Sequence, residues 1–160
     1  MSPFNVMNDD RFQDPVEARK KAMDYLARRE HGRAELLRKL EKSGFDPDIS
    51  KDAIAALVDD GLQSDERFAE AFVRSRINQG KGPQVIRADL RQRGLTSSLI
   101  DVALEDADEN WYALARDVRL KKFGPDTPSE FREKAKQMRF LQSRGFEPDQ
   151  VQAAVSAKFE

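Results

Sequence analysis

The chain has 160 residues, enough for one domain or a short array of repeats with its own hydrophobic core. Charged residues make up 36% of it and the mean hydropathy is −0.74, so the apolar residues must be concentrated on narrow stripes. The absence of cysteine excludes disulfides and thiolate zinc sites. The sequence has no signal-peptide pattern and no apolar stretch near the roughly 18 residues that span a bilayer. We therefore expect a cytoplasmic protein that makes no contact with a membrane.

Residues 1–13 are predicted to form a disordered leader, and residues 14–62 a first repeat of three helices. Asp14 is suited to cap the first of these helices, because its carboxylate can accept a backbone N–H of the opening turn. The third helix is expected to begin near Ser50, after an extended turn over residues 46–49.

A second repeat is predicted over residues 63–107. Its first helix carries Phe68 and Phe72 at helical spacing, which assigns both rings to the core. Pro83 is expected to open the middle helix, because proline fits the first helical position.

A third repeat is predicted over residues 108–160. Its first helix is expected to start at Asp108. A capping-box pattern over residues 127–130 predicts the start of a second helix that buries Phe131.

One motif recurs along the chain: a leucine, three further residues, a glycine and an apolar residue. It occurs at residues 40–45, 90–95 and 141–146. Glycine often ends a helix because it adopts positive φ without a Cβ clash, and the apolar residue after it packs back on the last turn. No segment has the alternation of a strand. The sequence therefore predicts an all-α fold of three tandem three-helix, helix-turn-helix-like repeats that form an elongated, curved array.

Catalytic and metal-binding patterns are absent from the sequence. His31 is the single histidine, and its place beside a glycine at a helix junction favours a capping or solvated ring over a metal ligand. No nucleophile lies near a candidate base, and the segment 80–83 lacks the spacing of a phosphate-binding loop. We expect no enzymatic activity, no cofactor and no metal.

The nearly neutral net charge of −1 conceals segregated charges. Residues 67–93 contain seven bases and two acids, and residues 132–144 contain five bases and one acid. Arg67 and Arg74 fall on one helical face, as do several bases of the second segment. These basic ridges predict a surface that binds a partner of mixed or negative charge.

Four segments of the sequence resemble the RecX family of regulatory proteins: RREHGRAEL at 28–36, DERFAEAFVRSR at 65–76, GKGP at 80–83 and KQMRFLQSRGF at 136–146. They occur in the family's order on a triple three-helix repeat, and the resemblance covers about residues 15–160. Gly32 departs from the pattern, since the family usually has serine there as an N-cap.

The resemblance implies a cytoplasmic modulator of the RecA recombinase. Such a protein binds in the groove of the RecA–DNA filament and inhibits ATP hydrolysis, strand exchange and co-protease activity. The polar motif positions give the candidate partner-binding residues Arg29, Arg33, Arg67, Arg74, Arg76, Arg87, Arg139 and Arg144. We expect a monomer that binds the RecA filament and touches nucleic acid phosphates weakly if at all.

A direct DNA-binding protein is the alternative, because three-helix units also build helix-turn-helix readers. The third helix of the first two predicted repeats is rich in acids, which disfavours insertion into the major groove.

Overall fold

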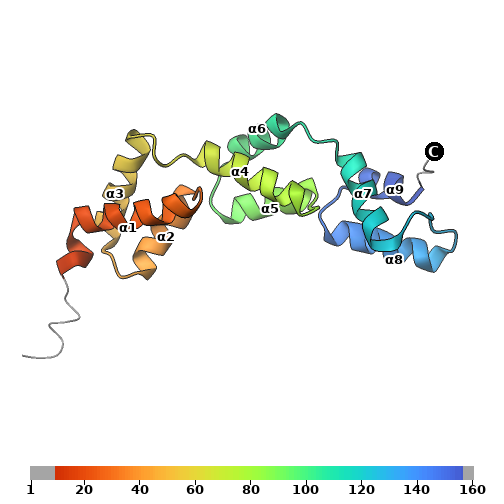
Figure 1. Ribbon diagram of the computed structural model, residues 1–160, viewed down its shortest axis with the longest axis horizontal. Coiled ribbons are helices and arrows are strands. Elements are labelled where there is room, and N and C mark those ends of the chain that lie inside the picture. Colours follow the sequence, from red (N-terminus) through yellow and green to blue (C-terminus); the bar gives the residue numbers. More distant parts are fainter. Residues whose placement is uncertain (1–9, 157–160) are drawn as a thin grey trace, which may run out of the picture. The chain divides into compact units, whose positions relative to one another are not determined.

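The computed structural model describes residues 10–156 of the chain, and within that range it contains helices and no strand (Figure 1). The helices are η2 (Asp10–Gln13), α1 (Pro15–Arg28), α2 (Arg33–Lys42), α3 (Pro47–Asp59), α4 (Asp65–Asn78), α5 (Pro83–Gln92), α6 (Ser97–Ala107), α7 (Trp111–Phe123), α8 (Phe131–Ser143) and α9 (Pro148–Ser156). The nine α-helices of this range follow one another in three groups of three. The predicted all-α fold with tandem three-helix repeats is confirmed.

The chain divides into two compact units. Among the described residues, the first comprises residues 10–69 together with Arg93–Leu95, and the second comprises Glu70–Gln92 and residues 96–156. None of the helices in the described range is long and apolar enough to cross a membrane.

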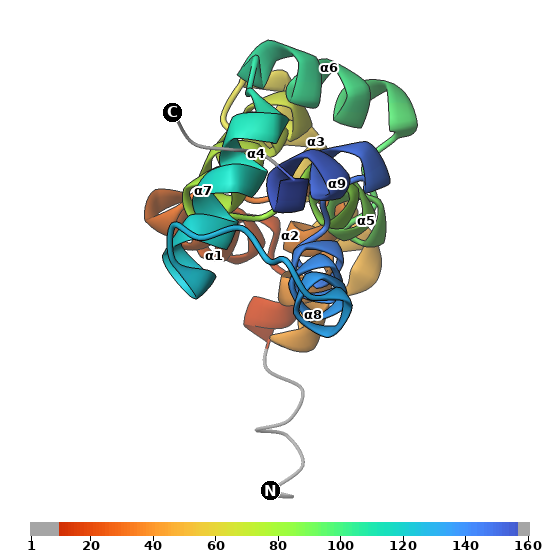
Figure 2. The same cartoon turned by 90° about the vertical axis from the view of Figure 1, so that its right-hand side faces the viewer.

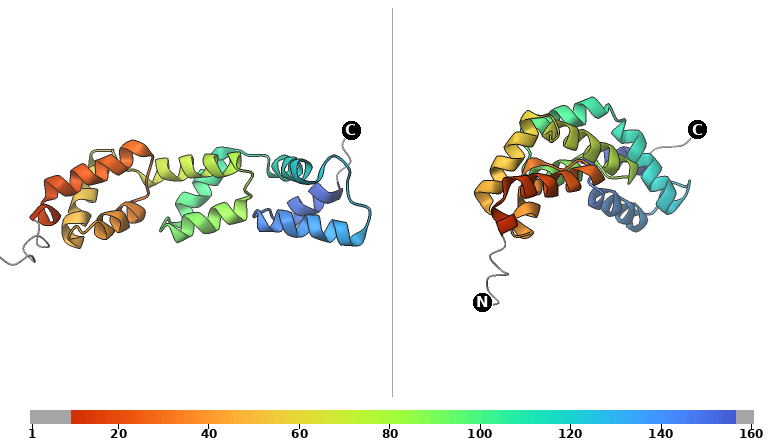
Figure 3. Two further views of the ribbon diagram at one scale, coloured as in Figure 1. Left: turned by 60° about the horizontal axis from the view of Figure 1, so that its bottom comes forward. Right: turned by 60° about the vertical axis from the view of Figure 1, so that its left-hand side comes forward.

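The core of the first unit lies between α1, α2 and α3, which pack on one another (Figure 3). Its fully buried side chains come from all three helices and are Ala18, Ala22, Leu36, Leu40, Ile54 and Leu57. In the second unit, α7, α8 and α9 surround an equivalent cluster, and Figure 2 shows these three helices in front. That cluster consists of Ala115, Leu141, Phe146, Val151, Ala154 and Val155.

The recurring glycines end their helices as the motif predicts. Gly44, Gly94 and Gly145 have φ angles of +109°, +89° and +96°. After Gly44, the N–H of Phe45 donates to the carbonyl of Leu40 at 3.1 Å, which is the backbone bond of a Schellman turn. The equivalent bond after Gly145 has a length of 3.3 Å.

Gly94→Val should lower the free energy of unfolding by more than about 1 kcal/mol. A β-branched residue is strained at this positive φ, and a Cβ here would lie 2.9 Å from the Cβ of Ala34. Urea unfolding followed by circular dichroism measures the change. Gly61→Val is the matched control, because Gly61 also has positive φ but a Cβ at that residue would have nothing within 4 Å. Equal losses for the two variants would show that the contact with Ala34 contributes nothing.

The third helix of the first repeat begins earlier than predicted. Asp46 caps α3 by accepting the N–H groups of Asp48 and Ile49, so the residues assigned to an extended turn form the first turn of the helix. Ser50 is fully buried at the position that Ile100 and Val151 occupy in the other repeats. A small polar residue at a core position conceals the helical pattern.

Two boundaries in the third repeat also differ from the prediction. The helix predicted from Asp108 begins at Trp111, because Asp108 itself adopts a left-handed conformation and ends α6. The second helix begins at Phe131, and Glu130 precedes it without a side-chain cap. Phe131 is 85% exposed, so its predicted burial is wrong.

The predicted disorder of residues 1–13 is wrong for residues 10–13, which form η2. The Phe12 ring packs edge-on against the Phe45 ring, with 5.4 Å between the ring centres. The backbone carbonyl of Phe12 accepts the N–H of Asp46. The rest of the predicted leader, residues 1–9, lies outside the described residues.

Candidate partner-binding surface

A buried carboxylate organises the polar groups of the first unit. Glu35, in the first turn of α2, is only 8% exposed. Arg29 holds it with two parallel bonds of 3.0 and 2.9 Å, and Arg93 donates to the same carboxylate at 2.8 Å. Burial alone would raise the pKa of Glu35, but the hydrogen bonds and the charges of the two arginines lower it to about 2. The carboxylate therefore stays ionised far into the acid range.

His31 lies beside this cluster and is 1% exposed, so of the two predicted roles, a capping ring and a solvated ring, the solvated ring is wrong. Its Nδ1 lies 3.0 Å from the carbonyl oxygen of Arg29, which can only accept, so Nδ1 carries the proton. Nε2 then accepts from the ammonium of Lys39 at 2.9 Å. Burial lowers the pKa of His31, and the neutral ring persists at pH 7.

The N-terminus of α2 is capped from another helix. Gly32 has no side chain to accept the first N–H groups, and the carboxylate of Asp65, at the start of α4, accepts the N–H of Arg33 at 2.7 Å. Gln63 donates to Asp65 at 3.0 Å and to the carbonyl of His31 at 3.1 Å. The departure from serine at position 32 is thus compensated by a carboxylate that satisfies an otherwise open donor.

The three predicted site residues of the first unit differ in their surroundings. Arg29 is bound to Glu35 as described, and this hydrogen bond raises the pKa of the guanidinium. Arg67 is exposed and donates to Glu30 at 3.2 Å. Arg33 presents an exposed side chain.

The second unit contains the other five predicted residues. Arg76 lies over the Phe72 ring at 4.0 Å, and Arg144 lies over the Phe140 ring at 5.2 Å. Arg87 is paired with Asp101. The two that remain, Arg74 and Arg139, are exposed, and Arg74 lines a hollow with Glu70, Asp106 and Glu109.

Among residues 10–156, no ion pair involves Arg33, Arg74 or Arg139. Arg29, Arg67 and Arg87, by contrast, each have an acidic partner. The structure brings Arg29 together with Arg93, which is not among the predicted site residues. His31, Glu35 and Lys39 are also absent from that set. Glu35 and Lys39 are four residues apart on α2, a spacing that places them on one helical face and could have revealed them, whereas His31 precedes that helix.

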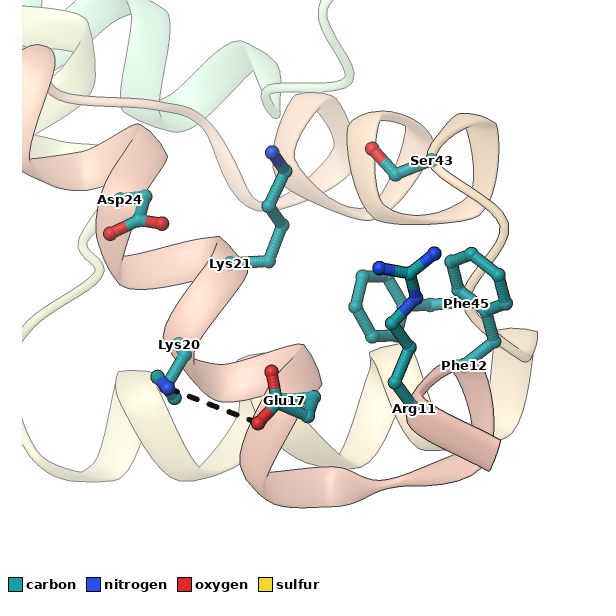
Figure 4. Close-up of a pocket in the computed structure, with 8 residues that line it drawn as sticks. All are labelled: Arg11, Phe12, Glu17, Lys20, Lys21, Asp24, Ser43 and Phe45. Atoms are coloured by element: carbon teal, nitrogen blue, oxygen red, sulfur yellow. Dashed lines mark ion pairs between the residues drawn. The ribbon is translucent and has the colours of Figure 1, made fainter. Parts of the chain in front are cut away.

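The first unit also contains an open hollow of about 510 Å³ beside α1 (Figure 4). Arg11 and Lys21 extend toward it, while Lys20 pairs with Glu17 at 3.9 Å and Asp24 adds a second acid. The hollow is lined by both signs of charge and by none of the predicted site residues. The described part of the chain holds no cluster of three potential metal ligands.

Models of the three three-helix domains of RecX match this chain in order, over residues 18–57, 64–104 and 108–155. The regulatory protein RecX of Halorhodospira halophila is 49% identical over 139 residues, 87% of this chain and 86% of that protein. The regulatory protein RecX of Pseudomonas fluorescens strain Pf-5 is 45% identical over 143 residues, 89% of this chain and 92% of that protein.

Two crystal structures share the fold. One, of regulatory protein RecX, has a TM-score of 0.76 and covers 98% of this chain and 79% of that chain. The other, of RecX from Lactobacillus salivarius, has a TM-score of 0.73 and covers 89% of this chain and 95% of that chain. Both are 24% identical to this chain.

Proposed function

Because this chain belongs to the RecX family of regulatory proteins, we propose that it regulates the RecA recombinase. It binds in the groove of the RecA–DNA filament and inhibits ATP hydrolysis, strand exchange and co-protease activity. The observation that carries this proposal is the ordered match of all three RecX domains, supported by relatives that share nearly half of the residues over most of their length. The protein acts as a cytoplasmic monomer and hydrolyses nothing itself.

The exposed arginines without an ion pair in the described range make the main contacts in this proposal. Arg33, Arg74 and Arg139 can each form a new charge-assisted hydrogen bond without first breaking an ion pair inside the protein. Arg67, Arg76, Arg87 and Arg144 contribute secondarily, since each is engaged with an acid or an aromatic ring. Arg29 supports the surface indirectly by holding Glu35.

Arg74→Glu combined with Arg139→Glu should raise the concentration needed to inhibit the DNA-dependent ATPase of RecA by about ten-fold or more. Each charge-assisted contact is worth about 1.5–3 kcal/mol, and reversal adds repulsion. The matched control is Lys42→Glu with Lys51→Glu, which changes the net charge equally at exposed bases of the first repeat. Inhibition by the control should equal that of the parent at two salt concentrations.

The same preparations are titrated with bare single-stranded DNA and with duplex DNA. If the Arg74 and Arg139 variant inhibited RecA normally while its DNA binding collapsed, these residues would belong to a direct DNA-binding function. If the parent protein had no effect on RecA, the proposed function would be wrong. The acids of α6 disfavour the DNA-binding outcome, since Asp101, Glu105 and Asp106 are all exposed on that helix.

A further inference from the structure

A second hollow, of about 540 Å³, lies in the second unit where the end of α4 meets α7 and α8. Ile77 of α4 and Leu114 and Val118 of α7 supply a half-buried aliphatic lining. Gly80 closes the end of α4 against Val118, whose Cγ2 atom would lie 2.9 Å from a Cβ at that glycine. The hollow thus has an apolar wall, and its volume is large enough for a small ligand or a few side chains of a partner.

Bases dominate the charged groups around this wall. Lys121 and Lys122 at the end of α7 are exposed, and Arg144 follows α8, whereas Asp117 is the one acid among the lining residues. The ammonium of Lys122 lies 5.6 Å from the centre of the Phe140 ring, and the guanidinium carbon of Arg144 lies 5.2 Å from it. Cations that rest on an aromatic ring keep a defined position at the edge of the hollow.

The neighbours of Phe140 disfavour a nucleobase as the occupant. Base stacking requires an open aromatic face. Phe123 meets the Phe140 ring edge to face at 5.4 Å, and Lys122 and Arg144 both lie near that ring. The remaining lining combines aliphatic side chains with cations, which complements aliphatic side chains flanked by carboxylates.

We propose that this hollow binds an acidic peptide segment that carries large aliphatic side chains. The aliphatic side chains enter between Ile77, Leu114 and Val118, and the neighbouring carboxylates pair with Lys121, Lys122 and Arg144. The inference deepens the proposed function, on which its biological meaning rests, because it names an acidic segment of the protein partner as the ligand. The binding itself can be measured without RecA.

The probe is a short fluorescein-labelled peptide in which pairs of leucine alternate with glutamate and aspartate, titrated with the full chain by fluorescence anisotropy. Lys121→Glu with Lys122→Glu should weaken its binding at least roughly five-fold, since two attractive contacts become repulsive. Leu120→Gln, which places an amide on the wall of the hollow, should weaken it without changing the net charge. A control peptide has serine in place of each leucine. The parent should bind this control peptide no more tightly than the variants bind the leucine peptide.

The matched control variant is Arg132→Glu with Lys136→Glu, which reverses two exposed bases of α8 that do not line the hollow. It should bind the peptide like the parent. Trp111 fluorescence and circular dichroism confirm that each variant is folded, and a variant that unfolds is replaced by Lys122→Gln alone. Equal binding by the parent and by the Lys121 and Lys122 variant would overturn the proposal, as would equal binding of the leucine and serine peptides.

A labelled single strand of DNA serves as the competing probe. If it bound the parent and lost affinity with Lys121→Glu and Lys122→Glu while the acidic peptide did not bind, the occupant would be nucleic acid and the proposal would be wrong. If the peptide bound as expected but the parent did not inhibit RecA, the proposed function would fail while the acidic-peptide site remained.

Discussion

Replacing Glu35 with alanine should lower the free energy of unfolding of the first unit by about 3 kcal/mol. The substitution removes three hydrogen bonds to a carboxylate and leaves Arg29 and Arg93 side by side without their shared counter-charge. Hydrogen exchange of the segment that contains α2, followed by mass spectrometry, measures the loss locally. Glu41→Ala is the control, because Glu41 lies on the same helix and is exposed.

The effect of Glu35 should depend on pH in a defined direction. Its pKa is about 2 in the folded chain and about 4.5 without the fold, so the stability that it contributes is complete above pH 4.5 and is lost as the pH falls toward 2. The difference in the free energy of unfolding between the parent and Glu35→Ala should therefore become smaller as the pH falls over that range. A difference that stayed constant from about pH 6 to about pH 2.5 would show that the carboxylate contributes no charge interaction.

His31 should cause a separate change in the free energy of unfolding, at higher pH than the step caused by Glu35. Burial lowers its pKa from the usual 6.5, so the folded chain resists protonation and loses stability as the pH falls below that value. Arg29, Lys39 and Glu35 all act on the ring, and the charges of Arg29 and Lys39 lower its pKa further. His31→Gln should remove this step and leave the lower step of Glu35 in place.

The helix-ending glycines are the features of the fold that are most predictable from the sequence. A glycine after an apolar stripe reports a local backbone requirement, and local requirements are visible in a single sequence. The predicted start of α3 is wrong because Ser50 is polar but fully buried. The predicted burial of Phe131 is wrong because its place in an apolar pattern does not show whether another element covers it.

The candidate site is less predictable than the fold. Arg93 and Glu35 are 58 positions apart, and their contact depends on how the second repeat meets α2 within the first unit. The same holds for Asp65, which caps a helix 32 positions away. The sequence shows which arginines lie within the motifs. Only the fold shows that Arg29 is held by Glu35 whereas Arg33 is exposed.

Phe68→Ala should cost about 3–5 kcal/mol, because it opens a cavity around a ring that is 3% exposed. The ring lies against Gly32, where a Cβ would be 3.2 Å from Cδ2 of Phe68. This close contact opposes any Cβ at position 32, where a serine would supply a cap of its own. Urea unfolding followed by circular dichroism measures the loss. A folded Phe68→Ala protein of unchanged stability that failed to bind RecA would instead assign the ring to an exposed site.

Gly32→Ser provides the companion variant that isolates this contact. In the parent background, the serine Cβ must displace the Phe68 ring by a few tenths of an ångström, which offsets the benefit of the hydroxyl cap. In the Phe68→Ala background the ring is absent, so the same substitution should be more favourable by about 1 kcal/mol than it is in the parent. Strictly additive effects would show that Gly32 and Phe68 are not coupled. Asp65 would then be the sole reason that the N-terminus of α2 tolerates glycine, because its carboxylate already accepts the N–H of Arg33.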